Sequence, residues 1–282
     1  LVELCRRLDG LPLAIELAAA RLRTFTPAQL VARLDDRFRL LTGGGRTAAP
    51  RHQTLRAVVA WSWELLSPDE RRFAERLAVF AGSITATAAP VAGVSAVRAL
   101  DLLVSLADKS LLQLADDAGD AAEDDEEPRF RMLETLREYG AERLAARGAL
   151  RAARDAHAAC FLALAEEAEP RLRGPDQVRW IMRLVAERDN VLAALRHAAA
   201  VGDAATAVRL GAALGLFWTM RGNHREAASW LGTALAVPGE SPPGARLMCT
   251  VYYVSNQGAG GDPRKSEESA AALRRTIAEA RR

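Results

Sequence analysis

A corner between two helices near the start of the chain constrains its fold most strongly. Residues 5–22 read CRRLDGLPLAIELAAARL, with Gly10 and Pro12 two positions apart. Glycine accepts the left-handed conformation that ends a helix, and proline fits a first helical turn because its missing N–H would have no partner there. We therefore predict two helices that meet here, the second with an apolar side that includes Leu13 and Leu17. Such a corner has two interpretations. It can simply join two helices without binding a ligand, or its backbone and the rigid ring of Pro12 can contact a flat ligand.

Composition indicates a mainly α-helical protein with about two domains of ordinary size. Of its 282 residues 50% are hydrophobic and only 5% aromatic, and alanine and leucine, both good helix formers, dominate. The net charge of +2 gives no global field that would recruit nucleic acid or a membrane. No apolar run reaches the ~20 residues of a membrane-spanning helix, and no signal peptide opens the chain. We expect a cytoplasmic protein and, because Leu1 and Arg282 both fall inside expected helices, a fragment of a longer one.

The sequence predicts neither a catalytic site nor a metal site. Its three cysteines are far apart and form no CxxC or Cys/His cluster. None of the four histidines stands beside a cysteine, serine or carboxylate pair with the spacing of a triad or a metal site. We expect His157 and His197 on the surface or rim of helices. His52, next to Arg51, is the best histidine for a contact with a nucleotide phosphate.

Residues 1–48 are expected to be helical and to end in a linker. Thr26 and Pro27 have the pattern of an N-cap and a first helical residue. The glycine triplet at 43–45 lacks the Gly-x-x-x-x-Gly-Lys-Ser/Thr spacing of a phosphate loop, so we interpret it as a flexible connection between domains.

The next unit, residues 49–147, has the element order of a winged helix. Ser67 and Glu70 form the pattern of a capping box, which predicts a helix start at Pro68. The expected elements are three helices followed by two short strands: a helix over 54–66, the helix from Pro68, a helix over 97–107, and strands at 110–114 and 129–132. The loop between the strands, 116–127, is dense in carboxylates and has no base, which argues against phosphate contacts by this wing.

From residue 148 to 282 we expect helix after helix. Trp180, Leu184, Val191 and Leu195 are predicted to line one helix face. Two similar turns, at 222–225 and 261–264, lie 39 residues apart, and each precedes an alanine-rich helix. Helix pairs at this period indicate a TPR-like α-solenoid, whose concave surface suits a peptide or protein.

The order of these motifs resembles the NB-ARC, or STAND, family of nucleotide-switched ATPases, in particular bacterial transcriptional regulators of the SARP and LuxR type. The resemblance is carried by GLPLA at 10–14, LDDRF at 34–38 and RHQTL at 51–55, and covers nearly the whole chain. It implies that Pro12 packs on the adenine of ADP or ATP, within a pocket that includes Gly10, Leu11 and Leu13. It also implies that the phosphate loop and the magnesium-binding acid belong to a missing N-terminal part.

Residues 132–134 look like the family's Met-His-Asp segment, in which the histidine senses the β-phosphate of ADP. Here the triplet is Met132-Leu133-Glu134, and leucine cannot donate a hydrogen bond to phosphate. Our hypothesis is that Leu133 is a core residue in place of the sensor, that Glu134 orients a neighbouring donor, and that the segment transmits the nucleotide state.

The sequence therefore predicts the C-terminal half of an ATP/ADP-switched module followed by a TPR-like sensor region. No nucleotide is expected to bind the isolated fragment. Expected partners are a protein or small-molecule inducer on the helical repeats, DNA through domains outside the fragment only, no membrane, and self-association on activation. Two alternatives stay open: a protein-interaction scaffold whose ATPase function has decayed, and a DNA-binding winged helix.

Overall fold

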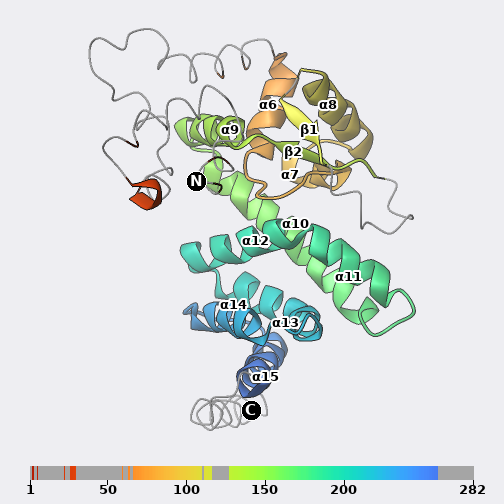
Figure 1. The fold of residues 1–282 in the computed structure, drawn as a ribbon, viewed down its shortest axis with the longest axis vertical. Helices are drawn as coiled ribbons and strands as arrows, with labels where there is room; N and C mark the ends of the chain where they lie inside the picture. The colour runs from red at the N-terminus through yellow and green to blue at the C-terminus, as the bar shows by residue number, and fades with distance from the viewer. Residues whose placement is uncertain are drawn as a thin grey trace. The chain divides into compact units, whose positions relative to one another are not determined.

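The computed structural model describes residues 66–109, 111–115 and 127–259, together with Val2, Cys5, Leu22, Thr26–Gln29, Val59 and Trp63. These residues are mainly helical, with one small two-stranded sheet, which confirms the predicted mainly-α class. They fall into two units (Figure 1). Unit 1 holds the described parts of Leu1–Val79, Thr85–Leu114 and Arg129–Leu150, and unit 2 holds those of Phe80–Ile84, Ala115–Pro128 and Arg151–Arg282.

Unit 1 contains helices on either side of a β-hairpin in the chain. Its elements are α6 (Pro68–Leu77), the 3-10 turn η2 (Ala86–Ala88), α7 (Ala89–Ala92), α8 (Ala96–Asp108), β1 (Leu112–Leu114), β2 (Phe130–Met132) and α9 (Glu134–Ala146). The strands are antiparallel, with Gln113 opposite Arg131. The predicted capping box is confirmed: the Ser67 amide donates to Glu70 Oε2 at 2.7 Å, and the Glu70 amide donates to Ser67 Oγ at 3.3 Å. The helix predicted at 97–107 and both predicted strands are also present.

The core of unit 1 lies where α6, α8 and α9 meet the hairpin. Phe73, Leu77, Leu103 and Leu106 are each at most 2% exposed. A close approach between α6 and α9 depends on Gly140, because a Cβ there would lie 2.8 Å from the Cβ of Ala78. Glu75, only 2% exposed on α6, meets α9 through Arg147 at 3.2 Å.

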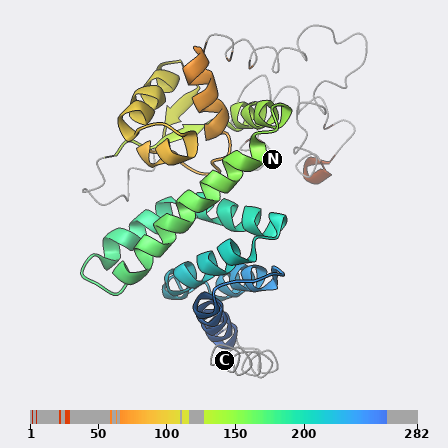
Figure 2. The ribbon, with the colours of Figure 1, turned by 180° about the vertical axis from the view of Figure 1, so that it is seen from behind.

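Unit 2 is a succession of helices, drawn from green to blue in Figures 1 and 2. They are α10 (Leu150–Arg171), α11 (Gln177–Ala186), α12 (Arg188–Val201), α13 (Ala204–Met220), α14 (His224–Ala236) and α15 (Pro243–Ala259). We predicted that Trp180, Leu184, Val191 and Leu195 line one face of a single helix. This prediction is wrong, because the chain turns at Glu187 and the four residues belong to two helices. Trp180 and Leu184 lie on α11, and the other two on α12.

The first of the two similar turns, at 222–225, connects α13 to α14. Gly222 has a φ of +72° after α13, and the side chain of Asn223 accepts the Glu226 amide at the start of α14. The second turn, at 261–264, lies outside the described residues. The repeat period therefore stays a prediction.

Two glycines of α13 let α14 and α15 approach closely. A Cβ on Gly211 would lie 2.6 Å from the sulfur of Cys249, and a Cβ on Gly215 would lie 2.1 Å from Cδ2 of Tyr252. The backbone of α13 therefore serves as the contact surface for the side chains of α15. Small residues at these positions set the distance between the two helices.

We predict that Gly215→Ala destabilises unit 2 by about 2–3 kcal/mol, because a methyl group has no room against the Tyr252 ring. Gly244→Ala is the matched control, since it places the same methyl group on α15 with nothing within 4 Å. Urea unfolding followed by circular dichroism measures both variants. A Gly215 variant as stable as the Gly244 variant would contradict this account of the packing.

Candidate functional site

The predicted nucleotide contacts are not among the residues that the structure describes. Gly10, Leu11, Pro12 and Leu13 of the adenine corner lie outside the described residues, as do Arg51 and His52. The acidic loop at 116–126 lies outside them too. The adenine pocket and the phosphate contact stay predictions.

Met132, Leu133 and Glu134 are described, and they form the junction between β2 and α9. Met132 is 6% exposed and belongs to the core, whereas Leu133 is half-buried at the N-cap of α9. Glu134 binds Arg137 one turn along the same helix, with Nε 2.9 Å from Oε2. Leu133 is thus only partly a core residue. Glu134 accepts a hydrogen bond from Arg137, and the part of this segment in nucleotide sensing stays a prediction.

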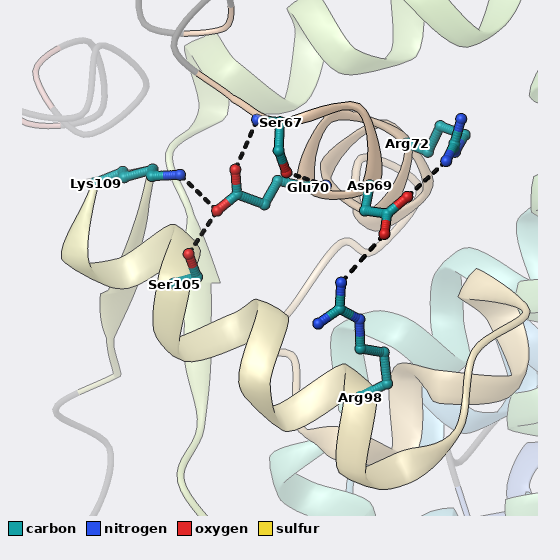
Figure 3. A network of polar contacts seen from close by, with 7 residues as sticks. All are labelled: Ser67, Asp69, Glu70, Arg72, Arg98, Ser105 and Lys109. Atoms are coloured by element: carbon teal, nitrogen blue, oxygen red, sulfur yellow. Dashed lines mark hydrogen bonds and ion pairs between the residues drawn. The ribbon is translucent and has the colours of Figure 1, made fainter.

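A polar network joins the start of α6 to α8 (Figure 3). Glu70 accepts hydrogen bonds at Oε1 from Lys109 Nζ and Ser105 Oγ, both at 2.5 Å, while its other oxygen accepts the Ser67 amide. Its side chain is only 8% exposed. The hydrogen bonds from Lys109 and Ser105 lower the pKa of Glu70 to about 2 and so keep it ionised.

The carboxylate next to Glu70, that of Asp69, binds Arg98 of α8. Asp69 accepts a hydrogen bond from Arg72 at 2.6 Å and another from Arg98 at 3.1 Å (Figure 3). Arg98 is the one basic residue within α8, and Lys109 follows directly at its C-cap. The carboxylates of α6 therefore engage both bases of the α8 region.

The outward face of α8 is apolar and acidic. Val97, Leu100 and Val104 are 76%, 38% and 46% exposed, opposite the buried Leu103 and Leu106. Asp101 and Asp108 are also exposed on α8. This helix is the third of the predicted winged helix, and its outward face offers no unengaged base for a phosphate. No local signal distinguishes this face in the sequence, because the buried residues 99, 102, 103 and 106 follow the same helical spacing as 97, 100 and 104.

We predict that Glu70→Gln lowers the free energy of unfolding of unit 1 by about 1–2 kcal/mol at pH 7, since it removes a charge from three hydrogen bonds. Because folding depresses the pKa of Glu70, its contribution is present above pH 4.5 and is lost as the pH falls towards about 2. Urea unfolding at pH 7 and pH 3 measures this. Asp69→Asn, at a 56% exposed side chain, is the control and should change stability by about 0.5 kcal/mol or less. Equal effects of both variants would contradict the prediction.

One histidine does not lie where the sequence placed it. His157 was expected at the surface or rim, but it is 3% exposed on α10 in unit 2, packed against the rings of Phe80 and Phe161 with centroid distances of 4.9 and 4.6 Å. Burial lowers its pKa to about 4. His197 of α12 binds Asp155 of α10, with Nε2 2.6 Å from Oδ1.

Within the described ranges, no three or more histidine, cysteine, aspartate or glutamate residues group in a way that could hold a metal ion. Among the same residues, no helix has the length and apolarity needed to cross a bilayer.

Comparison with known proteins gives mycobacterial relatives. "Putative HTH-type transcriptional regulator Rv0890c" of Mycobacterium tuberculosis is 40% identical over 243 residues, which are 83% of this chain and 26% of that protein. A Mycobacterium bovis protein with the same description, Mb0914c, matches equally. "Uncharacterized protein Rv0894" of M. tuberculosis is 41% identical over 151 residues, 52% of this chain and 37% of that protein. The chain thus spans about a quarter of the length of the regulators it matches. No protein-family model and no solved structure matches it.

Proposed function

We propose that this chain is the regulatory part of a STAND-type transcriptional regulator, in which unit 1 acts through protein contacts rather than by reading DNA. The claim that unit 1 does not read DNA rests on one observation: Arg98 donates a hydrogen bond to Asp69, and Lys109 donates one to Glu70. A winged helix that reads DNA needs free bases on its third helix, because neutralised phosphates supply most of the affinity. The name of the M. tuberculosis relative, a putative HTH-type transcriptional regulator, supports the regulatory role.

The proposed mechanism is a switch between ADP and ATP. ADP closes the helical corner at Pro12 and the winged-helix unit onto a phosphate-loop domain, and ATP or an inducer on the helical repeats opens them. Coupling of this kind typically amounts to about 1–3 kcal/mol. Pro12 would contact the base, Leu11 and Leu13 would line the pocket, and the segment at Leu133 would transmit the state. DNA would be bound through other domains of the whole protein, and opening would permit self-association.

An electrophoretic mobility shift at physiological salt, with the 282-residue chain and duplex DNA beside competitor DNA, tests the role of unit 1. We expect no retained complex. Calorimetric titration with ADP is the companion measurement, and we expect no binding in the micromolar range because phosphate recognition is assigned elsewhere. A sequence-specific shift would establish the DNA-binding alternative instead, and micromolar ADP affinity would overturn the assignment of phosphate recognition.

The scaffold alternative has one observation in its favour. Leu133 cannot sense a phosphate, and Met132 and Glu134 beside it are committed to the core and to Arg137. In the whole protein, an intact Gly-x-x-x-x-Gly-Lys-Ser/Thr with ADP binding supports the switch. A protein that lacks this motif and binds no ADP is a scaffold.

A further inference from the structure

The outward face of α8 carries more exposed large apolar side chains than any other described helix. Val97, Leu100 and Val104 are three of the eight large apolar side chains that are exposed among the described residues. At 3.6 residues per turn their Cα atoms fall within a sector of about 60° and extend about 10 Å along the axis. Single exposed apolar residues are common on proteins, whereas a row on one helix marks a contact surface.

The charges beside this row define what can cover it. Asp101 and Asp108 lie along one edge of it, seven residues apart, and neither forms an ion pair with a described residue. In the structure Arg98 and Lys109 pair with Asp69 and Glu70 of α6 and not with these two aspartates. The face is therefore an apolar ridge with an acidic edge that no base among the described residues compensates.

We propose that this face of α8 docks an amphipathic helix whose apolar side is bordered by lysine or arginine. A ridge two turns long and one side chain wide matches the groove between side-chain rows of another helix. Basic residues along the partner's border would pair with Asp101 and Asp108 and set its register. The proposal rests on the proposed function, since it names the kind of partner through which unit 1 acts.

A second copy of this chain is a poor occupant of the same face. In an antiparallel pair of α8 helices, Asp101 and Asp108 of one copy would lie against the same acidic edge of the other. Like charges held together across a contact oppose association. The acidic edge thus excludes pairing through α8 itself and favours a partner of opposite charge.

Two synthetic helical peptides test the proposal, with identical leucine stripes and either lysine or glutamate along the borders. Fluorescence anisotropy measures their binding to the 282-residue chain. We expect the lysine peptide to bind about tenfold more tightly, the effect of two exposed ion pairs. Val104→Ser should weaken the lysine peptide by about tenfold, and Asp101→Asn with Asp108→Asn should abolish the preference between the peptides. Val178→Ser, at a 69% exposed side chain of α11, is the matched control and should change nothing.

Three outcomes would overturn the proposal. They are equal binding of both peptides, binding that Val104→Ser leaves unchanged, and self-association in sedimentation that Val104→Ser removes, which would make a second copy the occupant. Circular dichroism and urea unfolding verify that the variants fold, as expected for a 46% exposed position. The mobility shift distinguishes failure of this proposal from failure of the proposed function. A sequence-specific shift would overturn the proposed function, whereas loss of peptide binding without such a shift would overturn only the docking of a basic helix on the apolar row.

Discussion

Replacement of Asn190 by alanine is expected to lower the free energy of unfolding of unit 2 by about 3 kcal/mol or more. Asn190 is fully buried on α12. Its Oδ1 accepts the amides of Ala81 and Gly82, both at 3.0 Å, while its Nδ2 donates to the Ser83 carbonyl at 2.9 Å and to Glu187 Oε2 at 2.8 Å. One side chain therefore satisfies three backbone groups of the segment Phe80–Ile84. Alanine would remove the partner of the buried Ser83 carbonyl and of the two amides, whose hydrogen bonds are partly buried.

The variants Asn190→Asp and Asn223→Ala make this test specific. Aspartate keeps an acceptor for the two amides but faces the Ser83 carbonyl and the Glu187 carboxylate with oxygen, so it should also destabilise unit 2. Asn223 is an exposed N-cap, whose replacement by alanine should cost about 1 kcal/mol. Urea unfolding gives the stabilities, and amide hydrogen exchange at Ala81 and Gly82 reports the local effect. A loss of less than 1 kcal/mol for Asn190→Ala, with unchanged exchange, would contradict the assignment.

Features set by neighbouring residues could be predicted from the sequence. The capping box of Ser67 and Glu70 forms as predicted because its two hydrogen bonds span three residues. The hairpin strands and α8 follow from local patterns in the same way. In contrast, the hydrogen bond from the Ala81 amide to Asn190 joins residues 109 positions apart in the chain, and no local pattern predicts it.

The candidate site was predictable only in part, for the same reason. The chain position of the Met132–Glu134 segment came from the motif, but the pairing of Arg98 with Asp69 depends on how α6 and α8 pack. That pairing decides whether the bases of α8 are available to phosphate. The burial of His157 was missed because it depends on Phe80, 77 positions earlier in the chain. A histidine on an alanine-rich helix gives no local signal of such a contact.

His157 is expected to make the stability of unit 2 depend on pH between about 6.5 and 4. Burial is the main cause that lowers its pKa from 6.5 to about 4; a hydrogen bond with Asn190 acts in the opposite direction, and the nearby His197 adds the smallest contribution, which also lowers it. Its Nε2 is buried without a hydrogen-bond partner among the described residues. Between these pH values the unfolded chain binds the proton and the folded chain does not. The contribution of the neutral His157 to the free energy of unfolding is therefore complete above pH 6.5 and is lost as the pH falls to about 4.

His157→Phe tests this dependence, because it keeps an aromatic ring packed against Phe80 and Phe161 and removes the titrating group. At about 1.4 kcal/mol per pKa unit, the wild-type chain should lose on the order of 3 kcal/mol from this residue between pH 7 and pH 4. Urea unfolding of both proteins at half-unit steps isolates the histidine, since every other titrating group is common to them. We expect the phenylalanine variant to match the wild-type chain at pH 7 to within about 1.5 kcal/mol and to be the more stable at pH 4. Parallel stability curves for the two proteins over this range would show that His157 does not carry the effect.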